Sequence, residues 1–288
     1  MDARPAGSDP ARYHTAPARY HTDGARFLGV RPSVQDDPDR WTLPLHRGLT
    51  GGKGGLFGGC AVGAAITGLE ARTGRPLRWI TTQFLAAVAP PDVLHFEVVD
   101  AVDGRNVAQA GVRVATEPSG GRTALLVSAA LGGRPGGDER RYLTAAAVAP
   151  PQDCPSMVQL GAGGGLRERF DIRAVPVRAE QAAPHTGRSA WWVGAGGVDV
   201  ASPELLAVAV DFVPFSLTAA LDRPVFGASL DNTVRLVDRA CAEWVLVDTA
   251  VEALVAGIGQ VSARVWSPEG HLLALATQTC VVSERPPS

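Results

Sequence analysis

SPELLAVAVDFVPFSL, residues Ser202 to Leu217, is the stretch that decides the fold. Ser202 suits an N-cap, Pro203 the first helical position and Glu204 the positive end of the helix dipole, so a helix is predicted to begin here. The following residues are apolar on nearly every side, which is typical of a buried helix. Asp211 interrupts them, and an unpaired buried carboxylate is costly. We therefore expect Asp211 to face a wet cavity or to have dedicated hydrogen-bond donors; a place on a solvated stripe is the simpler alternative.

The composition is that of a globular protein. The chain has 288 residues, of which 45% are hydrophobic and 19% charged, and its net charge is −2. The absence of a basic stripe argues against nucleic acid as a partner. The apolar runs fall short of the roughly 20 residues of a membrane span, and the N-terminus lacks the apolar core of a signal peptide. We expect no membrane partner and a cytoplasmic location.

Nothing in the sequence predicts a metal or a cofactor. The cysteines lie far apart without a CxxC pair, which argues against a zinc site or a disulfide framework: Cys60, Cys154, Cys241 and Cys280. A tandem ARYHT, at residues 11–15 and 18–22, is more typical of a solvated tail than of a metal site. The glycine-rich GGKGG at residues 51–55 lacks the spacing of a phosphate-binding loop.

The first half of the chain predicts one helix followed by a meander of strands. Apolar residues recur at helical spacing across Gly55–Gly74, and Gly74 is a natural C-terminal stop. The many glycines of this helix make sense if another backbone packs very close to it. Residues rich in Val, Thr and aromatics then predict four strands, at 77–87, 93–102, 105–116 and 123–130.

The second half repeats this pattern. Residues 110–129 match residues 261–279, and Arg113 pairs with Arg264, an offset of 264 − 113 = 151. The same offset places the helix at Gly55–Gly74 on the helix that begins at Ser202. Two apolar helices, each followed by a meander that could wrap it, predict an α+β fold of tandem (double) hotdog type. The expected parts are a tail at 1–26, an N-terminal hotdog at 27–131, a linker at 132–169, a C-terminal hotdog at 170–282 and a tail at 283–288.

Five motifs together carry a family resemblance. They are GGLFGG at 54–59, AVDFVPFSL at 209–217, ASLDNTVRL at 228–236, EWVLVDTAV at 243–251 and GIGQVSARVWSPEGHLLALATQTCVV at 257–282. In their order and spacing the chain resembles the acyl-CoA thioesterase II (TesB-like) family of double-hotdog proteins. The likeness covers residues 27–282 and is strongest in the last sixty or so.

The resemblance implies a function in lipid metabolism and a set of site residues. It implies hydrolysis of an acyl-CoA or acyl-carrier-protein thioester by activated water, without a cofactor, in a homo-oligomer. The family's Asp, Thr or Ser, and Gln correspond to Asp211, Ser229 and Gln278, with Ser229 where a Thr is common. Asp231 is an additional candidate, because two residues beyond Ser229 it would face the same side of a regular strand.

The chemistry can also be judged from the residues. A thioester is a reactive acyl group, so the protein must position a water, remove its proton and stabilise an oxyanion. Asp211 could orient the water or act as its base. The backbone N–H groups of Gly58 and Gly59 could serve the oxyanion if the two halves of the chain face each other. No serine or cysteine stands in a GxSxG elbow, which argues against an acyl-enzyme of the α/β-hydrolase kind.

The repeat predicts one active site per chain. The offsets place Cys60, Arg78 and Ser128 at the first-half positions of Asp211, Ser229 and Gln278. The first copy therefore lacks the three site residues and would act as scaffold and wall.

Two alternatives remain. A hotdog hydratase or dehydratase usually relies on a histidine, for which His46 and His95 are the nearby candidates in the first half. A non-hydrolytic acyl-thioester-binding protein of a biosynthetic pathway is the other alternative.

Overall fold

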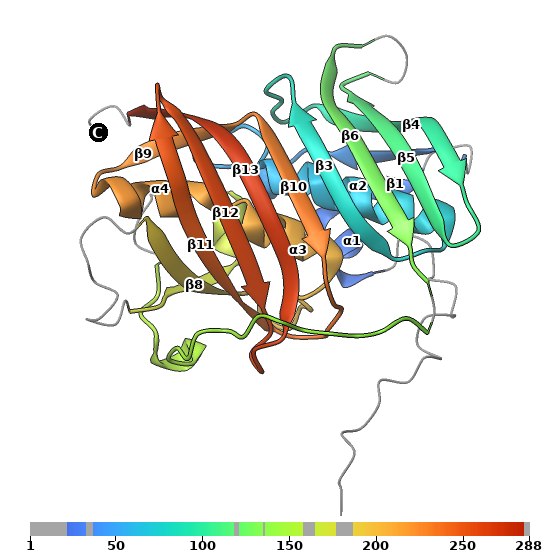
Figure 1. Cartoon of the computed structure of the whole chain (residues 1–288). Coiled ribbons are helices and arrows are strands. Elements are labelled where there is room, and N and C mark those ends of the chain that lie inside the picture. Colours follow the sequence, from blue (N-terminus) through green and yellow to red (C-terminus); the bar gives the residue numbers. More distant parts are fainter. Residues whose placement is uncertain are drawn as a thin grey trace, which may run out of the picture.

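The computed structural model describes residues 22–32, 37–117, 121–134, 136–157, 165–176 and 187–284. Its helices lie against one face of a large antiparallel sheet (Figure 1). They are α1 (Asp23–Leu28), α2 (Gly58–Thr73), α3 (Pro203–Val210) and α4 (Val213–Leu221), with short 3-10 helices η2 (Arg47–Leu49), η3 (Pro151–Asp153) and η5 (Leu166–Arg169). The first ARYHT copy and nearly all of the second lie outside the described residues.

The strands of the first half are β1 (Arg31–Pro32), β2 (Arg40–Pro44), β3 (Leu77–Phe84), β4 (Val93–Asp103), β5 (Val107–Ala115) and β6 (Thr123–Gly132). Those of the second half are β7 (Asp171–Ala174), β8 (Arg188–Gly194), β9 (Val225–Ser229), β10 (Asp231–Leu236), β11 (Trp244–Val255), β12 (Ile258–Trp266) and β13 (Leu272–Glu284). They form one sheet in the order β1-β2-β4-β5-β6-β3-β10-β13-β12-β11-β8-β7, and β9 pairs with β13.

The sheet has the same strand order on both sides of its centre. From β3 outward it runs through β6, β5, β4 and β2, and from β10 outward through β13, β12, β11 and β8. An ion pair recurs at the predicted offset of 151. Arg113 Nη2 lies 3.2 Å from Glu97 Oε2, and Arg264 Nη1 lies 3.9 Å from Asp248 Oδ2. The repeat in the sequence is therefore a repeat in the structure.

Strand pairing corrects one equivalence that the sequence predicts. Leu126 and Leu275 stand opposite the two equivalent arginines of β5 and β12, so these leucines are equivalent. Three residues further along each strand, Gln278 is equivalent to Ala129, not to Ser128. The predicted pairing was wrong by one residue, and in a strand one residue reverses the face. Ser128 is exposed, whereas Ala129 is buried on the core side.

The predicted helix from Ser202 to Leu217 is in fact two helices. Helix α3 ends at Val210 and α4 begins at Val213, and the N–H of Asp211 donates to Val208 O at 3.1 Å. A proline follows Val213 in the first turn of α4, where it has no N–H to donate and disfavours a helical conformation in the residue before it. Asp211 therefore stands at a helix end, not in the middle of a helix.

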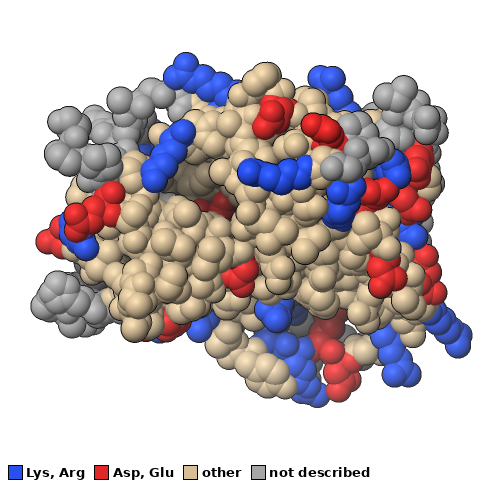
Figure 2. Space-filling view, turned by 90° about the horizontal axis from the view of Figure 1, so that it is seen from above, with Lys and Arg blue, Asp and Glu red and all other residues tan. Residues whose placement is uncertain are grey.

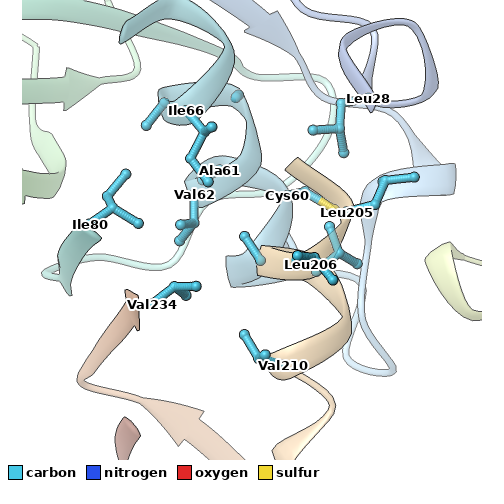
Figure 3. Close-up of a cluster of buried hydrophobic side chains, with 14 of the residues drawn as sticks. Leu28, Cys60, Ala61, Val62, Ile66, Ile80, Leu205, Leu206, Val210 and Val234 are labelled. Atoms are coloured by element: carbon cyan, nitrogen blue, oxygen red, sulfur yellow. The ribbon is translucent and has the colours of Figure 1, made fainter. Parts of the chain in front are cut away.

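Helices α2 and α3 pack with their backbones in contact, as the glycines of α2 predict. A Cβ at Gly59 would lie 2.6 Å from Ala207 O and 2.7 Å from Val208 Cα, and one at Gly63 would lie 2.7 Å from Glu204 O. Figure 3 shows side chains of these two helices meeting those of β3 and β10, including Ile80 and Val234, in one buried cluster. The core thus spans both halves of the chain.

Two of the expected domain limits fall differently. The predicted tail at 1–26 ends inside α1, whose first turn is capped by the Thr22 hydroxyl and whose Ala25 and Leu28 are buried. The predicted linker contains η3 and η5, and the Leu166 N–H of η5 donates to Thr50 O at 3.0 Å. Residues 158–164 of the linker and 285–288 of the C-terminal tail lie outside the described residues.

Among the residues that the structure describes, one segment is long and apolar enough to be a candidate membrane span. It is Pro203–Leu221, which covers α3 and α4, and 71% of its most apolar window is buried inside the molecule. Its apolar character therefore matches its place in the core.

Candidate active site

Four elements meet beside the break between α3 and α4. Asp211 follows the last turn of α3, Gly59 lies in the first turn of α2, Gln278 stands on β13 and Ser229 ends β9. Asp211 and Gln278 are each 4% exposed, and Ser229 is half-buried. The structure brings together the three residues that the sequence singles out, and it adds a backbone group from the first half of the chain.

Both oxygens of the Asp211 carboxylate have hydrogen-bond donors. Gln278 Nε2 donates to Oδ1 at 2.7 Å, and the backbone N–H of Gly59 donates to Oδ2 at 2.7 Å. The Gly59 donor belongs to a helix N-terminus, where the dipole favours negative charge. The expected dedicated donors are therefore present, and one of them comes from the half of the chain that was expected to be only scaffold and wall.

Burial has the largest effect on the pKa of Asp211. Desolvation raises the pKa of its carboxyl to about 6, and the hydrogen bonds from Gly59 and Gln278 act in the opposite direction. A carboxylate with this pKa is mostly ionised at neutral pH, yet it holds a proton more strongly than an exposed aspartate. Asp211 has the properties of a general base that works near neutrality.

Gln278 connects Asp211 to Ser229. Its Nε2 group donates to Asp211 Oδ1 and also to Ser229 Oγ. Its Oε1 accepts from Asn232 Nδ2 at 3.4 Å. Asn232 is a residue that the sequence reasoning missed, and the available signal was a polar residue at an inward-facing position of β10, directly after Asp231.

Asp231 does not join this cluster through its side chain. Its Oδ1 accepts from the backbone N–H of Thr279 at 2.7 Å, and the neighbouring Leu230 N–H donates to Thr279 O at 2.8 Å. These bonds hold the chain against β13 at the point where β9 passes into β10. Asp231 therefore fixes the backbone that carries Ser229.

The two glycines at the start of α2 differ in what they can donate. The Gly59 N–H is bound to Asp211, so the expectation that it donates directly to an oxyanion conflicts with this geometry. Gly58 is the first residue of α2, and the N–H at this position of a helix has no intrahelical acceptor. A Cβ at Gly58 would lie 3.1 Å from Asp211 Oδ2 and 2.9 Å from the Phe84 ring. No acceptor for the Gly58 N–H is seen within the described part of the chain, so Gly58 is a candidate donor beside the carboxylate.

This end of the sheet opens to solvent. Figure 2 looks onto it and shows a hollow with an acidic side chain in it and basic side chains beside it. Lys53, in the loop before α2, places Nζ 4.1 Å from the centroid of the Phe226 ring on β9. The loop of the first half thus contacts the strand that ends at Ser229.

The histidines and cysteines that the sequence offers as candidates either lie outside this hydrogen-bonded cluster or stay protonated at neutral pH. His46 Nδ1 accepts from the Gly48 N–H at 3.1 Å at the start of η2, and His95 lies on β4. Burial raises the pKa of the thiols of Cys60 and Cys280 beside Asp211, for Cys280 to about 11, so both stay protonated at neutral pH. Within the described ranges no cluster of three or more His, Cys, Asp or Glu could hold a metal.

Comparison with known proteins agrees with the motifs. Residues 151–282 match the family model of the acyl-CoA thioesterase C-terminal domain. No curated protein sequence matches the chain. Among solved structures, a candidate thioesterase from Novosphingobium aromaticivorans is 27% identical with a TM-score of 0.77, over 85% of this chain and 96% of that one.

Two further structures share the fold at lower identity. The tesB protein of Mycobacterium avium subspecies paratuberculosis is 17% identical with a TM-score of 0.72, over 91% of this chain and 98% of that one. A hotdog-fold protein of unknown function from Alicyclobacillus acidocaldarius is 20% identical with a TM-score of 0.74, over 88% and 95% of the two chains. The chain has the hotdog fold, its resemblance to the TesB-like thioesterases is confirmed, and its residues 151–282 match the acyl-CoA thioesterase C-terminal domain family.

Proposed function

We propose that this protein hydrolyses acyl-CoA thioesters with a water molecule that Asp211 activates. The single observation that carries the proposal is the buried Asp211 carboxylate, with Gln278 on one oxygen and Gly59 on the other. Such a carboxylate is fixed in position, is ionised near neutrality and lies beside a half-buried hydroxyl, Ser229. The family match supports a thioester hydrolase as the class of enzyme.

The proposed reaction needs no acyl-enzyme. Asp211 accepts a proton from a water whose oxygen attacks the thioester carbonyl carbon, and the carbonyl oxygen becomes an oxyanion. The tetrahedral intermediate collapses with cleavage of the C–S bond, and the thiolate leaves with the proton that Asp211 returns. The products are the free acid and the thiol of coenzyme A.

Ser229 and Gln278 would hold the water in position to attack the carbonyl carbon, and the Gly58 N–H would donate a hydrogen bond to the oxyanion. Ser229 Oγ accepts from Gln278, which leaves the hydroxyl proton for another acceptor. The Gly58 N–H is at a helix N-terminus, where the helix dipole favours a developing negative charge. These positions support an oxyanion site made of Gly58 with the first turn of α2.

We also propose that the two halves are tandem hotdog units. Each half combines a helical segment, α2 in the first and α3 with α4 in the second, with five strands in the same order, and the halves join through β3 and β10. The carrier of the acyl group is proposed to be coenzyme A, because the family model that matches is that of an acyl-CoA thioesterase.

A thiol-release assay with acyl-CoAs of several chain lengths tests the function. Asp211→Asn is expected to lower kcat by at least about a hundredfold, the scale of a lost general base. Asp248→Asn is the matched control, because burial also raises the pKa of the half-buried Asp248, which lies on β11. Unchanged thiol release in Asp211→Asn would refute the proposal.

The same assay separates the alternatives. Turnover of an enoyl thioester without thiol release would indicate a hydratase, and binding without turnover an acyl-binding protein. Among the described residues no histidine is hydrogen-bonded to Asp211, Ser229 or Gln278, which favours hydrolysis over a histidine-dependent hydration.

A further inference from the structure

A row of polar side chains crosses the centre of the sheet on its core face. Asn232 on β10 stands directly opposite Thr82 on β3. On its other side Asn232 donates to Gln278 on β13. Asn232 and Thr82 are both 0% exposed, and Gln278 is 4% exposed. Polar groups this deeply buried are costly unless they are hydrogen-bonded, so this row requires an explanation beyond packing.

The chemistry of an amide gives that explanation. A glutamine amide presents two donors on nitrogen and an acceptor on oxygen, and a flip of the amide exchanges them. In the observed orientation both acceptors, Asp211 Oδ1 and Ser229 Oγ, face Nε2 of Gln278. The flipped orientation would set the amide oxygen against the Asp211 carboxylate. Asn232 faces the other end of Gln278 with a donor, Nδ2, and this donor matches only the observed orientation.

We propose that Asn232 is a positioning residue, which keeps the Gln278 amide turned so that its NH2 group faces Asp211 and Ser229. Asn232 acts through Gln278 and does not touch the reacting atoms. Its effect on hydrolysis rests on the proposed function, but its effect on the Asp211 carboxylate does not. The unpartnered Asn232 Oδ1 and Thr82 Oγ1 are the remaining buried polar atoms of the row in the part of the chain that the structure describes.

The surroundings of Asp211 make this inference testable by titration. Its titratable neighbours are Cys60 on α2 and Cys280 on β13, and Asp231, next to Asn232, interacts with Cys280. Burial raises the pKa of both thiols, so they stay protonated well above neutral pH. The carboxylate of Asp231 is bound to the Thr279 N–H. A change in the Gln278 amide is therefore reported by the titration of Asp211.

Asn232→Asp is the sharpest variant, because it keeps the shape but replaces the donor with an acceptor. The new carboxylate attracts the NH2 group of Gln278, so Asp211 loses this donor and gains a nearby negative charge. Both changes favour the protonated form of Asp211. The midpoint of the Asp211 titration, followed by carbon-13 NMR of its side-chain carboxyl, is expected to rise by about one pH unit or more. The acid limb of kcat/KM is expected to move with it.

Two further variants serve as control and reserve. Thr233→Val is the matched control, because Thr233 is the next buried residue of β10 and its hydroxyl bonds to Thr81 at 2.9 Å on the other face of the sheet. It is expected to leave the Asp211 midpoint unchanged. Asn232→Leu removes the donor without adding charge, so it separates the loss of the Gln278 donor from the direct effect of the new charge in Asn232→Asp.

The outcomes separate this inference from the proposed function. An Asp211 midpoint that stays at the wild-type value in a folded Asn232→Leu protein overturns the positioning role, because this variant removes the donor and adds no ionisable group. Thiol release that persists in Asp211→Asn instead overturns the proposed function, and the NMR midpoint still tests Asn232 in that case. A raised midpoint in the Asn232 variants, with none in Thr233→Val, supports the inference.

Discussion

At the scale of single residues, the ionised form of Asp211 that the proposed reaction needs should lower the free energy of unfolding. Burial raises its pKa from 3.8 to about 6, so the folded state binds this proton more tightly than the unfolded state. The protonated carboxyl therefore makes its full contribution to the free energy of unfolding below pH 4, and this contribution is lost as the pH rises through 6. A pKa shift of about two units corresponds to roughly 3 kcal/mol at most.

We expect Asp211→Asn to unfold at higher urea concentration than wild type at pH 8, with no gain at pH 4. An equal gain at both pH values would contradict this, because wild-type Asp211 is already protonated at pH 4.

The same titration should appear in the activity. If Asp211 must be ionised to accept a proton from water, kcat/KM falls about tenfold per pH unit below its pKa of about 6. The pH profile of thiol release is therefore expected to have an acid limb with a midpoint near 6. Any residual hydrolysis by Asp211→Asn should lack that limb. A wild-type profile that is flat from pH 5 to 8 would exclude Asp211 as the base.

At the scale of secondary-structure elements, the contact between α2 and α3 positions the carboxylate. A Cβ at Gly59 would lie 2.6 Å from Ala207 O, and such overpacking typically costs about 1–3 kcal/mol. We expect Gly59→Ala to lower the urea midpoint and also the activity, because separating the helices moves the Gly59 N–H away from Asp211. Gly52→Ala is the matched control, since a Cβ at Gly52 would meet nothing within 4 Å. Equal stability of the two variants would show that the helices are not tightly packed.

The same elements show how far the sequence could lead. The extents of α2 and of the strands follow from local patterns, because apolar spacing and turn residues act within a few positions. The break after Val210 depends on a single proline against a strongly helical apolar run, so the sequence predicted one helix. Asn232 could not be singled out, because its meaning comes from Gln278, which is 46 residues away along the chain. Side chains that act through partners on another strand become visible only when the pairing is known.

At the scale of the whole molecule, the two halves should unfold together. Strands β3 and β10 pair over five residues, and Thr81 and Thr233 share a hydrogen bond of 2.9 Å across this seam. Helices α2 and α3 bury one core from both halves. We expect a single calorimetric transition, with a calorimetric enthalpy equal to the van't Hoff enthalpy. Two resolved transitions would mean that the halves are independent domains.

The duplicated fold should nevertheless hold only one active site. At the first-half position of Gln278 the strand pairing places Ala129, which cannot donate, and the sequence offset places Cys60 at the position of Asp211. The second half also uses the Gly59 N–H of the first, so a complete site requires one contribution from each half. Calorimetric titration with a non-hydrolysable thioether analogue of the substrate is therefore expected to give one binding site per chain, weakened by Gln278→Ala and unaffected by Ser128→Ala. A stoichiometry of two would mean that the first half binds the acyl thioester without these residues, and the role assigned to Asp211 and Gln278 would then not explain recognition.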